Sequence, residues 1–69
     1  MESQEAKLYR GNEYVKSLCL IGNNDDFDEI VVEPDGTMTV TTIEDYLTDD
    51  GGYEQRYFTY EGITRINFK

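Results

Sequence analysis

The chain has 69 residues and a formal net charge of −9, from fifteen acidic and six basic side chains, and it contains no histidine. A single domain of this size, residues 1–69, buries only about 60% of its unfolded surface, so we expect a thin core. Strong negative charge opposes contact with phosphate backbones and anionic membranes, so we expect neither nucleic acid nor membrane as a direct partner. Cys19 is the single cysteine and the N-terminus does not resemble a signal peptide, which together favour a reducing, cytoplasmic setting.

The N-terminal part has two interpretations. Residues 1–5 are polar, and we expect them to fray. In the first interpretation, residues 7–10 and 13–21 form a hairpin about the turn pair Gly11-Asn12. In that hairpin Tyr9 would lie opposite Tyr14, and the oppositely charged Arg10 and Glu13 would also face each other. In the second, Asn12 caps a helix over residues 13–21, which would make the fold α+β. The apolar run LCLI favours the strand.

The strongest structural signal is a hairpin over residues 27–44. Its turn contains Pro34, Asp35 and Gly36. Proline presets φ, aspartate accepts hydrogen bonds from its own backbone, and glycine adopts the left-handed conformation that ends a type I turn with a bulge. If Glu33 opposes Thr37 at this turn, apolar side chains share one face of the hairpin, in the pairs Ile30–Val40 and Val32–Met38.

The C-terminal part predicts a third hairpin. Residues 48–52 have the composition of a loop or hairpin tip, although Thr42 offers an alternative cap for a short helical turn before it. Residues 53–60 and 63–68 then pair about residues 61–62. We predict a core made of Ile30, Val32, Met38, Val40, Tyr57, Ile66 and Phe68. The fold class is therefore all-β, an antiparallel meander of three consecutive hairpins with five or six strands, a pattern compatible with a closed or barrel-like sheet.

Negative charge is concentrated in the middle of the chain. Neither lysine nor arginine occurs between Lys16 and Arg56, and that window holds eleven acidic residues. Alternate residues of a strand lie about 6.8 Å apart, so carboxylates on strands and turns can imitate a phosphate backbone. We therefore expect a basic protein partner, such as a nucleic-acid-binding protein, at Asp25, Asp26, Asp28, Glu29, Asp49 and Asp50. The same charge also fits a solvated face that only keeps the domain soluble.

In size, acidity and lack of catalytic groups the chain resembles small phage or mobile-element inhibitors, some of which are DNA mimics. The resemblance is one of profile, without a shared residue motif. It implies a non-enzymatic inhibitor that occupies the basic surface of a nucleic-acid-processing protein, within the host cell if the protein is phage-encoded.

A structural or assembly module is the alternative function. Such a module would associate through its sheet edge or an aromatic face, and a homodimer is one possible assembly. The predicted third hairpin leaves one face half-exposed with aromatic and arginine side chains, which are typical of protein interfaces. This second candidate surface consists of Phe58, Tyr60, Ile63 and Arg65.

Catalysis and metal binding are both disfavoured. Without histidine the chain lacks the usual general base at neutral pH, and Cys19 lies inside an apolar run. Asn24, Asp26 and Asp28 have the alternate spacing of a calcium loop, but the sixth position is Glu29, where such a loop needs glycine. We expect no enzymatic activity, no metal and no cofactor.

Overall fold

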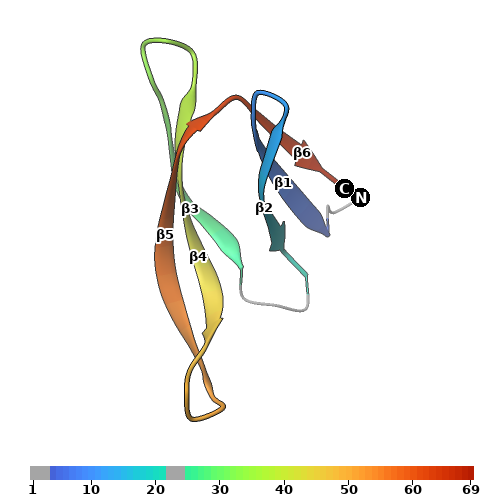
Figure 1. The fold of residues 1–69 in the computed structure, drawn as a ribbon, viewed down its shortest axis with the longest axis vertical. Helices are drawn as coiled ribbons and strands as arrows, with labels where there is room; N and C mark the ends of the chain where they lie inside the picture. The colour runs from blue at the N-terminus through green and yellow to red at the C-terminus, as the bar shows by residue number, and fades with distance from the viewer. Residues whose placement is uncertain (1–3, 22–24) are drawn as a thin grey trace.

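Six antiparallel strands form two three-stranded sheets in the computed structural model, which describes residues 4–21 and 25–69. The strands are β1 (Glu5–Arg10), β2 (Glu13–Cys19), β3 (Asp26–Val32), β4 (Met38–Leu47), β5 (Tyr53–Ile63) and β6 (Arg65–Phe68). The strand orders are β2-β1-β6 and β3-β4-β5, and Figure 1 shows the two sheets side by side rather than closed into a barrel. The all-β prediction is confirmed. The alternative helix over residues 13–21 is wrong, because β2 occupies that segment.

The first hairpin has the predicted register. Tyr9 pairs with Tyr14 and Arg10 with Glu13 across β1 and β2. The two tyrosine rings pack edge to face with their centroids 6.1 Å apart, and the arginine and glutamate form an ion pair of 3.1 Å. Gly11 in the connecting turn has a φ of 63°, which glycine adopts at no steric cost. Local turn chemistry and cross-strand pairing therefore determine this hairpin.

The central hairpin also follows its turn chemistry. The Glu33 N–H donates to the Thr37 carbonyl at 2.8 Å, and the Gly36 N–H, in the left-handed conformation at φ 88°, donates to the Glu33 carbonyl at 3.0 Å. The Asp35 carboxylate accepts hydrogen bonds from the hydroxyl and N–H of Thr37, and these bonds lower the pKa of Asp35. The predicted pairs Ile30–Val40 and Val32–Met38 are both confirmed.

The second strand of this hairpin runs further than the first. β4 extends to Leu47, so the short helical turn capped by Thr42 does not form. Residues 48–52 make the tip that joins β4 to β5, with Gly51 at a φ of 86°. In Figure 1 this tip lies at the bottom, at the far end of the long β4–β5 hairpin.

The predicted pairing of residues 53–60 with residues 63–68 is wrong. β5 continues through residues 61–62 and pairs with β4, while β6 pairs with β1 in the other sheet. Gly62 has a positive φ, 68°, but it lies in a bulge between β5 and β4 rather than in a hairpin turn. Thr64 separates β5 from β6, and its N–H donates to the carbonyl of Tyr9 at 2.9 Å. The chain therefore crosses from one sheet to the other at this point (Figure 1).

The two ends of the described chain lie together. The N–H groups of Gln4 and Glu5 both donate to the carbonyl of Lys69, at 2.6 and 3.0 Å, and Lys69 donates back to Glu5 at 2.8 Å. Of the N-terminal residues that we expected to fray, Gln4 and Glu5 are thus hydrogen-bonded, and residues 1–3 lie outside the described part.

The core lies where β1 faces β4 and β5. Leu8, Val40 and Ile63 are fully buried and pack together there, and Met38 and Ile66 pack half-buried against them. The predicted core is therefore right for Val40 and partly right for Met38 and Ile66. It is wrong for four residues that are mainly or substantially exposed, namely Ile30, Val32, Tyr57 and Phe68.

The four exposed residues have physical reasons for their positions. Ile30 and Val32 lie on β3, the edge strand of its sheet, and the β2-β1-β6 sheet does not cover them. Tyr57 pairs with Ile43 on the outer face of the sheet, since Thr42 and Glu44 on either side of Ile43 point inward. Phe68 ends β6 and is exposed, although its ring packs against Phe27 with centroids 6.1 Å apart. The sequence shows which residues share a face but not which face another sheet covers.

Candidate functional site

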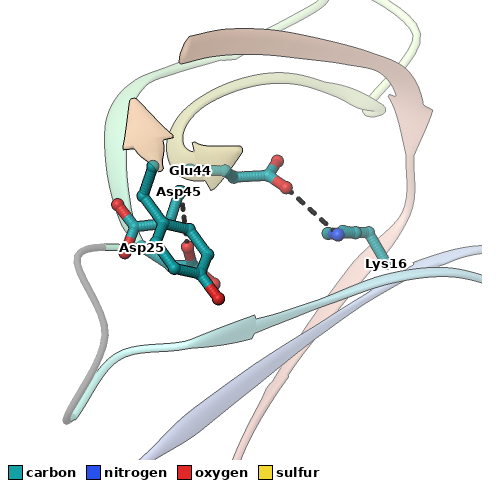
Figure 2. A pocket seen from close by; sticks show the side chains of 5 residues that line it. Lys16, Asp25, Glu44 and Asp45 are labelled. Carbon is teal, nitrogen blue, oxygen red and sulfur yellow. Dashed lines mark hydrogen bonds and ion pairs between the residues drawn. The ribbon is translucent and has the colours of Figure 1, made fainter. Parts of the chain in front are cut away.

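A buried carboxylate lies at the junction of the two sheets. Glu44 follows Val40 and Thr42 on the inner face of β4 and is only 5% exposed. Its Oε2 accepts hydrogen bonds from the hydroxyls of Thr42 and Tyr60, each at 2.6 Å, and its Oε1 lies 3.1 Å from Nζ of Lys16 on β2. Figure 2 shows this ion pair spanning the space between the sheets. The Glu44 cluster, as we call Lys16, Thr42, Glu44 and Tyr60, therefore ties the two sheets together.

The Glu44 cluster keeps its carboxylate ionised. Burial by itself would raise the pKa of Glu44, but the hydrogen bonds from Thr42 and Tyr60 and the ammonium of Lys16 outweigh burial and lower that pKa below its usual value. Burial and the adjacent carboxylate raise the pKa of Tyr60, so its hydroxyl remains a donor. Sequence analysis missed this cluster, although the two-residue period from Val40 through Thr42 to Glu44 indicates a shared inner face.

Asp25 forms a second connection between the sheets. Its Oδ2 accepts the N–H of Cys19 at 3.1 Å and its Oδ1 accepts the N–H of Asp45 at 3.1 Å. Figure 2 shows Asp25 beside Asp45 rather than turned outward. The carboxylate of Asp25 thus satisfies backbone donors at the end of β2 and within β4, which is a structural role.

A hollow of about 380 Å³ opens beside these groups, lined by Lys16, Asp25, Glu44, Asp45 and Tyr53. Glu44 and Asp25 already use their oxygens within the protein, and Lys16 is paired. No group of three or more potential ligand side chains within the described ranges could hold a metal ion. Of the residues with calcium-loop spacing, Asn24 lies outside the described residues, and Asp26 and Asp28 are exposed on β3. The hollow is therefore a depression lined mainly by acidic side chains.

The other predicted acidic residues point outward. Asp26, Asp28 and Glu29 are exposed on β3, and we call these three residues the anionic edge. The register of β3 against β4 shifts between Phe27 and Glu29, which leaves Asp28 in a β-bulge. Asp26 accepts a hydrogen bond from the N–H of Phe27, and no side chain that the structure describes forms an ion pair with the anionic edge.

Asp49 and Asp50 lie apart from the anionic edge, in the tip that joins β4 to β5. Both are exposed. The Asp50 carboxylate accepts hydrogen bonds from the Thr48 hydroxyl and the Gly52 N–H, and these bonds lower the pKa of Asp50. The six acidic candidates therefore divide into one structural residue, three on an edge strand and two in a turn.

The basic side chains are placed elsewhere. Four of the six form ion pairs with carboxylates of the same chain, as Lys7–Glu5, Arg10–Glu13, Lys16–Glu44 and Arg56–Glu54. A fifth, Arg65, lies over the ring of Tyr9 at 4.2 Å from its centroid. The charge of the anionic edge is therefore not compensated locally.

The second candidate surface does not form as expected. Ile63 is fully buried in the core, and Tyr60 points inward to Glu44. Phe58 is half-buried on β5, whereas Arg65 belongs to β6 in the other sheet. The structure separates these residues because the hairpin that would have joined them is absent.

Replacing Asp25 with alanine is expected to lower the free energy of unfolding by about 1–2 kcal/mol, because two backbone N–H groups lose their acceptor. Urea denaturation followed by circular dichroism measures this change. Asp26→Ala is the matched control, with an expected change of about 0.5 kcal/mol or less, since Asp26 is the next residue and is exposed. Equal effects of the two substitutions would contradict the structural role of Asp25.

Comparison with protein-family models, curated proteins and solved structures gave no match. Within residues 4–21 and 25–69 there is no helix of the length and apolar character needed to cross a membrane. Fold and site together define a small antiparallel β protein whose two sheets are joined by carboxylate contacts and whose β3 edge is acidic and exposed.

Proposed function

We propose that the protein is a non-enzymatic binding protein that uses its anionic edge to occupy the basic surface of a protein partner. The observation that carries this proposal is the segregation of charge: Asp26, Asp28 and Glu29 are exposed and without ion pairs in the described chain, while most basic side chains are neutralised elsewhere. An uncompensated anionic surface accelerates association with a basic partner and repels nucleic acid.

The basic partner is a nucleic-acid-processing protein, in keeping with the profile of small phage inhibitors. Occupation of a phosphate-binding surface would inhibit such a protein by competition. Asp49 and Asp50 in the β4–β5 tip add exposed negative charge. Asp45 adds charge at the hollow, and a lysine or arginine side chain has the chemistry to enter there.

An assembly module is the second candidate function. The outer face of the long β4–β5 hairpin carries apolar side chains in opposed pairs, half-buried Ile43 with exposed Tyr57, and exposed Leu47 with exposed Tyr53. Exposed aromatic groups of this kind are typical of protein interfaces. Binding through this face would be insensitive to salt, whereas binding through the anionic edge would weaken steeply as ionic strength rises.

Reversing the charge of the anionic edge tests the primary function. We expect Asp26→Lys, Asp28→Lys and Glu29→Lys together to weaken binding to a basic partner about 100-fold at low salt, from loss of attraction and added repulsion. Asp25 is left unchanged because it holds the fold. The measurement is titration calorimetry against a partner recovered by pull-down with the unmodified protein.

Two matched variants sharpen this test. Replacing the same three residues with their amides should cause about half the loss of binding free energy or less, since attraction is deleted without repulsion. Reversing Glu13, Glu54 and Glu61, which are exposed on other strands, changes the net charge equally and should alter the affinity about threefold or less. Equal losses from both reversals would show that total charge, rather than the anionic edge, determines binding.

A further inference from the structure

The backbone of β3 has a free hydrogen-bonding edge. β3 is the first strand in the order β3-β4-β5, and within the described residues it pairs with β4 alone. The hydrogen bond from Glu33 to Thr37 identifies a hydrogen-bonded pair, and such pairs alternate along an antiparallel ladder. Val31, paired with Thr39, therefore directs its N–H and C=O groups toward β4, whereas Ile30 and Val32 direct theirs outward.

The side chains at this free edge are apolar and uncovered. Ile30 and Val32 lie on the inner face opposite Val40 and Met38, yet they are 43% and 70% exposed. Natural edge strands usually avoid such exposure by charges, bulges or proline. Here the bulge at Asp28 and the residue Pro34 protect only the two ends of the strand, and the centre stays open. A second strand added beside Ile30 and Val32 would satisfy the backbone groups and bury apolar area.

We propose that an extended segment of the basic partner adds to β3 as a fourth strand of the β3-β4-β5 sheet. This proposal rests on the proposed function and specifies how its partner docks. Carboxylates flank the free edge at Asp28, Glu29 and Glu33, so the complementary segment alternates apolar residues beside Ile30 and Val32 with lysine or arginine on the other face. Main-chain hydrogen bonds supply affinity, and the charges select basic sequences.

The charges of β3 disfavour a second copy of the same chain as the occupant. A two-fold antiparallel pairing that uses the outward groups of both Ile30 and Val32 has its centre at Val31. That register places Glu29 of each copy opposite Glu33 of the other, and like charges directly opposite destabilise a sheet. The same carboxylates attract a basic strand.

The test uses a short synthetic peptide in which valine and isoleucine alternate with lysine and arginine, and the readout is amide hydrogen exchange of the intact protein by NMR. In the free protein the amides of Ile30 and Val32 should exchange rapidly, and the amide of Val31, bonded to Thr39, slowly. At saturating peptide we expect exchange at Ile30 and Val32 to slow at least about tenfold. A peptide with the same side chains but N-methylated backbone groups is the control, and it should give no protection.

Val32→Pro provides a matched variant of the protein. Proline removes the outward N–H but no bond to β4, and it leaves the net charge unchanged. We expect about tenfold weaker peptide binding with an unchanged circular dichroism spectrum. Should this variant fail to fold, the N-methylated peptide still decides the question on the unmodified protein.

The outcomes separate this proposal from the proposed function. Peptide binding without protection at Ile30 and Val32 would overturn strand addition while leaving charge-based binding intact. Protection that is unaffected by Asp26→Lys, Asp28→Lys and Glu29→Lys together would support strand addition and overturn the role of the anionic edge. Failure of the peptide to bind at low salt would overturn the proposed occupant. Slow exchange at Ile30 and Val32 in the absence of peptide, together with a doubled molecular mass, would also overturn it, because a second copy of the chain would then occupy the edge.

Discussion

Replacing Glu44 with alanine is expected to lower the free energy of unfolding by about 3 kcal/mol. The substitution removes the shared acceptor of Thr42 and Tyr60 and leaves Lys16 without its carboxylate, and loss of one member of a buried polar group typically costs about 3–5 kcal/mol. Because Lys16 remains partly in contact with water, we expect a loss of stability at the lower end of this range. The measurement is urea denaturation at neutral pH.

Two further measurements isolate the charge of Glu44. Glu44→Gln keeps the volume and one oxygen acceptor, so we expect it to cost about half as much as the alanine substitution. Glu54→Ala removes an exposed ion pair with Arg56 and should cost about 1 kcal/mol or less. If Glu44→Ala were no more costly than Glu54→Ala, the cluster would not hold the sheets together.

The pH dependence follows from the lowered pKa of Glu44. A carboxyl group whose folded-state pKa lies below its unfolded value contributes stability that is complete above the unfolded value of 4.5 and is lost as the pH falls through the folded value. The stability difference between the unmodified protein and Glu44→Gln should therefore be constant near neutral pH and shrink in acid. A difference that grows on acidification would contradict the lowered pKa.

Replacing Leu8 with alanine is expected to cost about 3 kcal/mol, within the range for a leucine whose cavity cannot fully collapse. Leu8 is fully buried with Val40 and Ile63 at the contact between the sheets. Because a small domain has a total stability of about 5 kcal/mol, this loss would leave only about 2 kcal/mol and should lower the melting temperature markedly. Thermal and urea denaturation both measure the change.

Leu47→Ala is the matched control for Leu8→Ala. Leu47 lies at the end of β4 and is 59% exposed, so the same chemical change should cost about 0.5 kcal/mol or less. Similar losses at the two positions would place the core elsewhere than between β1, β4 and β5.

The parts of the fold that were predictable are those with local causes. Turn residues at Gly11 and at Pro34 to Gly36 determine two hairpins together with their registers. The pairing of β6 with β1 could not be predicted, because its partners are separated by more than fifty residues, as in the pair Leu8–Ile66. A Glu-Gly pair is equally compatible with a turn and with a bulge, and only the distant partner of β6 decides between them.

The site was less predictable than the fold. A carboxylate in an acidic sequence is solvated by default, and for Asp26, Asp28 and Glu29 that expectation of exposure is confirmed. Asp25 differs from these exposed residues because its carboxylate oxygens accept hydrogen bonds from the N–H groups of Cys19 and Asp45. Only the tertiary structure brings these two groups together. Its side chain type and neighbours in the sequence give no indication of that role.

The crossing of the chain after Gly62 also determines when the first sheet can be completed during synthesis. β1 is translated early, but one of its two neighbours is β6, which is translated last among the described strands. While the nascent chain emerges from the ribosome, one edge of β1 and the apolar side chains of Ala6 and Leu8 therefore remain without their final cover. Because such non-local pairing is slow and exposes strand edges, the first sheet is completed only after the β3-β4-β5 segment has been made.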